Sequence, residues 1–238
     1  MFPSDSIQVV CLKWGTKYSA DYVNYLYASI KRNTTLDFNF TCFTDDPTGV
    51  HCNTHPLPSG LDGWWNKLYL FSSEIPFPTH ARIVYIDLDS VITGNVDDIL
   101  SVQSDRIVVL RDFYTGLSRK VVGNECVGSG LMAWEHGAHA EIWTRFASNP
   151  GDAVSSVAPH GDQKWIERMA TSRVYWQDVL PNQVVSYKVH CYAGLPNDAR
   201  IICYHGRPSI PESILHPVTV FNKTVGPSSW ISAHWNDK

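Results

Sequence analysis

The chain has 238 residues, of which 44% are hydrophobic and 18% are charged, and its formal net charge is −4. This length suits one large domain or two small ones and is ample for a packed core. The longest apolar runs fall far short of the ~18 residues that a membrane span requires, so the composition excludes a transmembrane protein, a collagen and a disordered chain. The negative charge argues against broad electrostatic capture of nucleic acid or anionic membranes.

The first part of the chain predicts a strand, a helix and a second strand. Residues 7–12 are an apolar run typical of a strand, and a loop follows at 13–18. A helix should begin at Ser19, because apolar side chains then recur at the spacing of one helix face. These side chains are Val23, Leu26, Tyr27 and Ile30. Residues 38–44 alternate as the second strand, so this order indicates a parallel sheet.

The rest of the chain continues to alternate between expected helices and strands. An aromatic helix is expected at 64–71, and residues 82–86 form a short, continuously apolar strand typical of a buried parallel sheet. The other expected strands are 106–110, 130–134, 184–189 and 201–204, and the other expected helices are 138–146 and 161–170. No repeat, charge run or linker divides the chain, so we predict one α/β domain with irregular insertions in its second half.

The cysteines and the first residues indicate the compartment. The six cysteines show no Cys-x-x-Cys spacing and several lie in apolar runs, so we expect free thiols. Residues 1–10 lack a basic stretch followed by a long apolar core, so no signal peptide is expected. Together these features predict a reducing, cytoplasmic location.

Two aspartates directly follow the apolar strand at 82–86. In open α/β sheets ligands bind at the carboxyl ends of strands, and Asp87 and Asp89 stand at such an end, one residue apart. They could be solvated loop carboxylates, but the apolar strand that leads into them favours a site. Hard oxygen ligands in this position suit Mg²⁺ or Mn²⁺ that carries substrate phosphates.

His205 is a third candidate ligand, because it follows the expected strand at 201–204. A lone histidine in such a place is more often an ordinary hydrogen-bonded residue. If His205 joins the two aspartates, its imidazole nitrogen favours Mn²⁺ over Ca²⁺ or Mg²⁺, because it is softer than oxygen donors. Arg207 would then lie beside the same phosphates.

The order of these motifs resembles the GT-A glycosyltransferases, in particular the glycogenin and lipopolysaccharide galactosyltransferase group, over about residues 7–208. The resemblance implies a single GT-A (Rossmann-like) domain at 1–208 with a mixed, mostly parallel central sheet flanked by helices, and a tail at 209–238 packed on it. It also implies transfer of a sugar from a nucleoside diphosphate sugar to an acceptor hydroxyl, with Mn²⁺ (or Mg²⁺) and with retention of anomeric configuration. The acceptor, whether glycan, lipid-linked sugar, protein or modified nucleic acid, leaves no mark in the chain.

The resemblance assigns roles residue by residue. Asp87, Asp89 and His205 match the metal ligands of the family. Asp162 and Gln163 match an Asp-Gln pair that faces the reacting sugar and are the implied catalytic residues. The positions that match nucleotide-sugar-binding segments are Lys13, Trp14, Tyr18, Lys67, Asp112, Ser129 and Arg207.

The chain departs from the family's pattern at three places. The segment His205-Gly206-Arg207-Pro208 is shorter than the family's His-x-x-Gly-x-Lys-Pro, which changes the spacing on which the phosphate-binding role of Arg207 depends. Lys67 replaces the arginine of a Tyr-x-Arg-Leu motif. Gly128 stands where the family has an asparagine that would touch the sugar.

Several roles stay open from the sequence. Asp162 could stabilise a cationic sugar carbon, attack it as a nucleophile or deprotonate the acceptor hydroxyl, and it could instead cap the helix expected at 161–170. Five tryptophans could stack on sugars, although tryptophan at helical spacing is more often part of a core. They are Trp14, Trp64, Trp65, Trp230 and Trp235.

Two other functions compete with glycosyl transfer. A sugar-1-phosphate nucleotidyltransferase should carry a glycine-rich phosphate loop after the first strand, where this chain has only Gly15. A catalytically silent carbohydrate-binding protein would bind sugar through its tryptophans and use the aspartates for structure alone. Metal-dependent hydrolysis of the donor separates a transferase from such a binding module.

Overall fold

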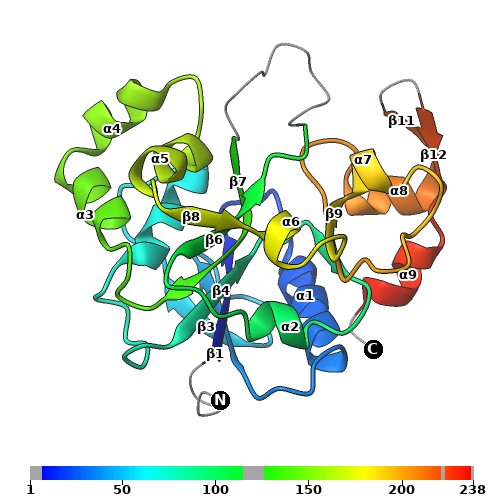
Figure 1. Ribbon diagram of the computed structural model, residues 1–238, viewed down its shortest axis with the longest axis horizontal. Coiled ribbons are helices and arrows are strands. Elements are labelled where there is room, and N and C mark those ends of the chain that lie inside the picture. Colours follow the sequence, from blue (N-terminus) through cyan, green and yellow to red (C-terminus); the bar gives the residue numbers. More distant parts are fainter. Residues whose placement is uncertain (1–6, 115–125, 221–222, 237–238) are drawn as a thin grey trace.

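The computed structural model describes residues 7–114, 126–220 and 223–236, and its centre is a seven-stranded sheet (Figure 1). The strands are β1 (Ile7–Lys13), β2 (Asn39–Thr44), β3 (Asn53–Pro56), β4 (Arg82–Ile86), β6 (Ile107–Arg111), β7 (Val127–Glu135) and β8 (Arg173–Tyr175). Their spatial order is β3-β2-β1-β4-β7-β6-β8, and only β7 runs antiparallel to its neighbours. The predicted α/β fold with a mixed, mostly parallel sheet is confirmed.

Helices cover both faces of this sheet (Figure 1). The helix α1 (Ala20–Arg32) lies on one face. The other face carries the 3₁₀ helix η2 (Gly63–Phe71), α3 (Glu141–Ser148), α4 (Pro150–Val157) and α5 (Asp162–Met169). The remaining helices are short: α2 (Asp97–Leu100), α6 (Trp176–Val179), α7 (Tyr187–His190), α8 (Ile210–Leu215) and α9 (Trp230–His234).

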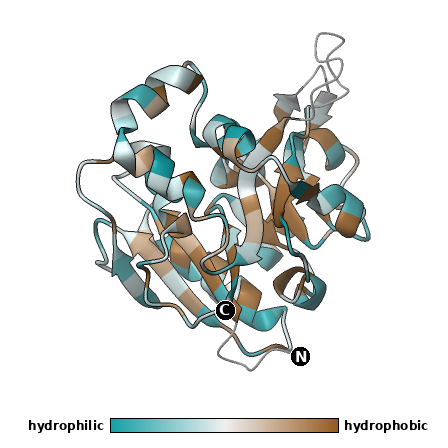
Figure 2. Ribbon diagram, turned by 60° about the vertical axis from the view of Figure 1, so that its left-hand side comes forward, coloured by the Kyte–Doolittle hydropathy of each residue, from teal (hydrophilic) through white to brown (hydrophobic). Residues whose placement is uncertain are grey.

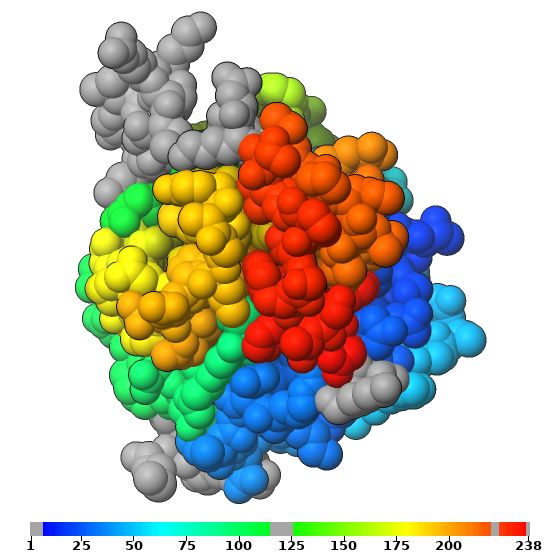
Figure 3. Space-filling view, turned by 90° about the vertical axis from the view of Figure 1, so that its right-hand side faces the viewer, coloured from blue at the N-terminus to red at the C-terminus, as the bar shows by residue number. Residues whose placement is uncertain are grey.

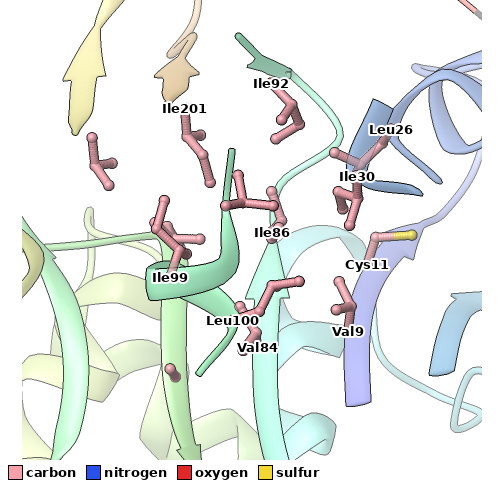
Figure 4. Packing of buried hydrophobic residues seen from close by; sticks show 14 of the residues in the cluster. Val9, Cys11, Leu26, Ile30, Val84, Ile86, Ile92, Ile99, Leu100 and Ile201 are labelled. Carbon is pink, nitrogen blue, oxygen red and sulfur yellow. The ribbon is translucent and has the colours of Figure 1, made fainter. Parts of the chain in front are cut away.

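The central strands are buried on both sides because successive side chains point to opposite faces. Val9 and Cys11 of β1 pack with α1, whereas Val10 and Leu12 pack with η2 and α3. Figure 4 shows the first of these clusters, and Figure 2 shows hydrophobic strands enclosed by more hydrophilic helices. This two-sided burial explains why β1 and β4 are continuously apolar in the sequence.

A second, smaller sheet extends the first cluster. It contains β5 (Ser90–Ile92), β10 (Ile201–Cys203) and β9 (Val184–Ser186) in that spatial order, and a separate hairpin joins β11 (Val218–Val220) to β12 (Lys223–Val225). Because β5 directly follows the segment 87–89 and β10 precedes residue 205, this sheet brings the late part of the chain to the loop after β4.

The last helix packs against α1, as the red and blue surfaces in Figure 3 show. The Ser29 hydroxyl donates to the carbonyl oxygen of His234 at 2.7 Å. The ring of Trp235 lies edge-on to Tyr22 and Tyr25, with centroids 5.0 and 4.9 Å away. These contacts tie residues 230–236 to the main domain.

Several sequence expectations differ from the structure. The strand expected at 184–189 ends at Ser186, whose hydroxyl accepts from the Val189 amide and so caps α7. The segment after 208 contains α8, which begins with a capping box between Ser209 and Glu212. The strands β3 and β8 were not expected, because each lies at a sheet edge and lacks an apolar run.

The cysteines are free thiols, as expected from their spacing. Cys11 and Cys42 lie opposite each other on β1 and β2, and burial raises the pKa of the Cys11 thiol well above its usual value. Separately, none of the helices within the described part of the chain combines the length and the apolar character needed to cross a membrane.

Candidate active site

One edge of the large sheet forms a cleft. The strands β1, β4 and β6 end here, and the chain continues into residues 14–18, 87–89 and 112–114. The antiparallel β7 begins at the same edge, so residues 128–130 complete the wall. The cleft has a volume of about 450 Å³, within the range of small-molecule sites.

Most of the residues expected from the sequence meet in this cleft. The lining includes Trp14, Tyr18, Lys67, Asp87, Asp89, Asp112, Ser129, Asp162, Gln163 and His205. They come from seven separate segments of the chain, so their convergence is a property of the fold rather than of local spacing. Lys13 and Arg207 do not belong to the lining.

A buried chain of charges runs across the floor of the cleft. The Lys67 Nζ lies 3.3 Å from Oδ1 of Asp87 and 3.2 Å from Oδ2 of Asp162, so one ammonium joins two carboxylates. Lys67 also donates to the Ser129 hydroxyl at 3.1 Å, and that hydroxyl donates to Asp162 at 2.7 Å. Because the side chains of Lys67 and Asp162 are only 7% and 9% exposed, these groups hold one another in fixed positions.

The protonation of Lys67 follows from this arrangement. Burial alone would lower the pKa of Lys67, but the charges of Asp162 and Asp87 outweigh it and raise the pKa above its usual value. Lys67 is therefore a permanent cation whose charge is already shared between two anions. A single positive charge against two negative ones leaves this end of the cleft net negative.

Glycine at position 130 permits the close approach of β7 to Asp87. The Asp87 amide donates to the Gly130 carbonyl oxygen at 2.8 Å, and a β-carbon on Gly130 would lie 3.1 Å from Oδ2 of Asp87. The pairing of β7 with β6 shifts register between Val108 and Leu110, which displaces residues 129–130 from a regular ladder. This irregularity brings Ser129 into the cleft beside Lys67.

Asp162 is not a helix cap. The helix α5 begins at Asp162 itself, its N-cap residue is Gly161, and no side chain caps it. Both hydrogen-bond contacts of the Asp162 carboxylate, from Lys67 and Ser129, go to Oδ2. The capping role weighed from the sequence is therefore wrong, and the carboxylate faces the cleft.

Asp89 lies at the other end of the cleft, next to the loop after β1. Tyr18 donates its phenol hydrogen to Oδ2 of Asp89 at 2.8 Å, and the Lys17 ammonium lies 4.6 Å above the Tyr18 ring. Burial, and then the charge of Asp87, raise the pKa of Asp89 to about 6. Two adjacent carboxylates in a partly dry site thus carry charge that a cation would neutralise.

His205 faces the same region from the end of β10. Its Nε2 lies 2.7 Å from the Ser186 hydroxyl, and its ring stacks on Phe113 with centroids 5.8 Å apart. Burial and the charge of Lys188 lower the pKa of His205 to about 4. The ring is therefore neutral at pH 7, which is the form that binds metals.

The expected metal ligands line one cleft but are not gathered around a single point. Within residues 7–114, 126–220 and 223–236, no three His, Cys, Asp or Glu side chains have the arrangement of a preformed metal site. Asp87 is held by Lys67 and Tyr85, Asp89 by Tyr18, and His205 by Ser186. The donor set of two carboxylates and a neutral imidazole nevertheless fits Mn²⁺ or Mg²⁺ in chemical type.

Lys13 and Arg207 point elsewhere. Lys13 is buried and its Nζ donates to the carbonyl oxygen of Asp46 at the end of β2. The Arg207 side chain is 92% exposed and its nearest carboxylate is Glu212, at 3.8 Å. Neither side chain reaches the cleft in the way that the sequence resemblance implies.

The sequence resemblance assigned no role to two lysines, one that lines the cleft and one that contacts a lining residue. Lys17 lines the cleft two residues beyond Gly15. Lys188 lies on α7 with its Nζ 3.5 Å from the Tyr114 hydroxyl, and burial lowers its pKa although the charge of Asp89 opposes that shift. No motif surrounds Lys188, because only the pairing of β9 with β10 brings it beside His205.

The comparisons with solved structures find glycosyltransferases. The galactosyltransferase LgtC, in complex with donor and acceptor sugar analogs, superposes with a TM-score of 0.63 over 86% of this chain and 89% of LgtC, at 10% identity. The glycosyltransferase GlyE of Streptococcus pneumoniae TIGR4 gives 0.60 over 86% of this chain and 56% of its own, at 11% identity. This protein has a GT-A fold.

The solved structures that share this fold have little sequence similarity to the chain. The bifunctional glycosyltransferase WbbM also matches, with a TM-score of 0.54 over 86% of this chain and 46% of WbbM, at 11% identity. No family model matches the sequence. A search of curated proteins finds no match either. The GT-A architecture is thus shared with proteins whose sequences have diverged almost completely.

Proposed function

We propose that this protein transfers a sugar from a nucleoside diphosphate sugar to an acceptor hydroxyl, with the help of a divalent cation. The observation that supports it most is the chain Asp87–Lys67–Asp162, which joins the expected metal end of the cleft to the expected sugar end. The structural neighbours are glycosyltransferases with the same fold, which supports the same class of reaction.

The charge of the cleft favours a cation-dependent donor. Four aspartates line it, whereas the basic residues of the lining are Lys17, Lys67 and Arg111. Both terminal nitrogens of the Arg111 guanidinium donate to the carboxylate of Asp178. A diphosphate that enters such a net negative cleft would be repelled without an added positive charge. A bound divalent ion would supply that charge.

Asp87, Asp89 and His205 are the residues that would hold the cation. When bound, the ion would stabilise the negative charge that develops on the departing diphosphate. Tyr18 positions Asp89 through its hydroxyl, and its ring is available at the cleft to a nucleotide base. Lys17 and Lys188 flank this end and take over the phosphate-facing role that the sequence resemblance gave to Arg207.

Asp162 is the group best placed to act on the sugar. Its Oδ2 is held by Lys67 and Ser129, which fixes the carboxylate in position. A fixed anion near the anomeric carbon stabilises an oxocarbenium-like transition state. Gln163, the next residue of the lining, supplies an amide for the sugar hydroxyls. We propose retention of the anomeric configuration, which NMR of the first-formed product measures.

One contact in the loop after β1 disfavours a nucleotidyltransferase. The amide of Gly15, the loop's single glycine, donates to the Asp45 carboxylate at 2.9 Å. A phosphate-binding loop needs such amides directed at the phosphates, and an aspartate in that place would repel them.

The deciding experiment is a panel of nucleotide sugars assayed for release of nucleoside diphosphate, with Mn²⁺, with Mg²⁺ and with chelator. A transferase leaks activated sugar to water in the presence of metal, whereas a carbohydrate-binding protein does not. The variant Asp89→Ala should abolish metal-dependent release, and Asp105→Ala, whose side chain is exposed away from the cleft, should leave it unchanged. Wild-type activity of Asp89→Ala would refute the metal assignment.

A further inference from the structure

We propose that the acceptor is a saccharide whose ring stacks on the indole of Trp64; this rests on the glycosyl transfer proposed above. Trp64 lines the cleft and is 52% exposed, which is unusual for the largest apolar side chain. Among the described residues no aromatic ring packs on it. An exposed indole at the mouth of a polar cleft is available to a ligand.

Trp64 differs from Trp65, Trp230 and Trp235 in that its side chain is exposed at the cleft. Trp65, the next residue of η2, stacks on Phe146 with centroids 5.5 Å apart and belongs to the core. Trp230 and Trp235 pack near α9, away from the cleft. The core role weighed for all five tryptophans therefore does not apply to Trp64.

The lack of a side chain at Gly161 leaves room for the indole of Trp64. A β-carbon on Gly161 would lie 2.7 Å from Nε1 and 3.0 Å from Cε2 of Trp64, so the five-membered ring of the indole lies against the backbone of this glycine. The φ of Gly161 is −96°, which any residue can adopt. The absence of a side chain is thus required by the indole and not by the turn.

The position of Trp64 indicates an acceptor rather than a donor contact. Across the cleft, the expected metal end at Asp89 and Asp87 is followed by Lys67 and then by Asp162. Trp64 lies at the Asp162 end, because its indole lies against the backbone of Gly161, the residue immediately before Asp162. A donor bound through its diphosphate would place its sugar at Asp162, so the ring beyond it belongs to the acceptor.

The chemistry of an indole selects a sugar ring. A pyranose presents C–H groups on one face and hydroxyls around its rim, and the electron-rich face of tryptophan attracts such C–H groups. Gln163 and Asp162 line the cleft beside Trp64 and can bind the rim hydroxyls. The hydroxyl of a serine or threonine side chain offers no flat apolar face for this platform.

The test measures saccharide binding and turnover separately. Saturation-transfer NMR with lactose, maltose and cellobiose, in the presence of Mg²⁺ and nucleoside diphosphate, compares the wild type with Trp64→Ala, Trp64→Phe and Gly161→Ala. We expect at least one disaccharide to bind the wild type and to bind Trp64→Ala at least about tenfold more weakly, with Phe restoring most of the affinity. Gly161→Ala should resemble Trp64→Ala. Tyr192→Ala, another exposed aromatic outside the cleft, is the control.

The same proteins are then assayed with the donor that the wild type hydrolyses. Trp64→Ala should raise the acceptor KM at least about tenfold and lower transfer more than donor hydrolysis, whereas Tyr192→Ala should leave both rates at the wild-type value. Equal loss of hydrolysis and transfer would make Trp64 a donor contact and overturn the proposal. So would unchanged disaccharide affinity in Trp64→Ala, or no binding of any disaccharide to the wild type. A wild type that binds disaccharide but hydrolyses no donor would instead refute the proposed transfer.

Discussion

Asp162→Asn tests the buried chain of charges at its most informative point. The substitution keeps the shape of the side chain and one oxygen that can accept from Lys67 or Ser129, but it removes the negative charge. Lys67 then shares its charge with Asp87 alone, at 3.3 Å. The perturbation is thus electrostatic, at a place where the side chains of Lys67 and Asp162 are almost fully buried.

The expected loss in the free energy of unfolding depends on the contacts that Lys67 keeps in the variant. Leaving a buried charge entirely without a partner costs about 3–5 kcal/mol, but Lys67 keeps one carboxylate and the Ser129 hydroxyl. We therefore expect a loss of about 1.5–3 kcal/mol in the free energy of unfolding, the range for a hydrogen bond to a charged group. The rate of sugar transfer should fall at least ~100-fold, because a fixed anion at the reacting carbon is lost.

The assay pairs denaturant unfolding with initial rates of product formation. The matched control is Glu167→Gln, on the same helix, which removes a carboxylate that accepts from the Val127 amide at 3.2 Å outside the cleft. It should lose stability while turnover per folded molecule stays near the wild-type value. If Asp162→Asn keeps wild-type transfer, the catalytic role of Asp162 is wrong. If its stability is also unchanged, the ion pair with Lys67 contributes nothing.

Three further predictions concern other residues. Partial burial alone would raise the pKa of Asp97, but hydrogen bonds from Thr34, Asn95 and Thr35 lower it to about 2. The stability that ionised Asp97 contributes should therefore be present above pH ~4 and be lost as the pH falls toward 2. At pH 7 the free energy of unfolding of Asp97→Asn should be about 1 kcal/mol below that of the wild type. Unfolding titrations should show this difference vanish between pH ~4 and pH ~2. Arg207→Ala should leave the donor KM unchanged, because the exposed side chain does not reach the cleft; a KM increase as large as that of Lys188→Ala would contradict this. Lys188→Ala should raise the donor KM about tenfold and Lys188→Arg should not, if the cation beside His205 faces the diphosphate.

The fold could be predicted from the sequence because the central strands are long enough apolar runs to be recognised. Residues 82–86 are buried on both faces of the sheet and therefore form an apolar run, unlike a surface segment. Asp87 and Asp89 follow directly at the end of this strand. The edge strand β3 was missed because its four residues are half-buried or exposed and include no apolar pattern. Short elements in the second half were missed for the same reason.

The site was harder to predict where it depends on contacts between distant segments. Lys67 was expected to bind the nucleotide sugar, but its pairing with Asp87 and Asp162 arises only when η2 and α5 pack together beside β4. Arg207 follows a candidate ligand in sequence, yet the chain turns outward after residue 205 and directs the side chain toward α8. Side-chain direction after a strand end is set by tertiary packing, which residue spacing does not encode.

The packing of α9 on α1 gives the far end of the chain an influence on the donor side of the cleft. Trp235 touches Tyr22, the ring of Tyr22 lies 4.8 Å from that of Tyr18, and Tyr18 bonds Asp89. Shortening the protein before residue 230, or fusing a bulky tag to its last residue, would disturb the aromatic support beneath Asp89 without touching a single ligand-binding group. Loss of activity in such a shortened protein would therefore report a displaced carboxylate rather than a missing catalytic residue.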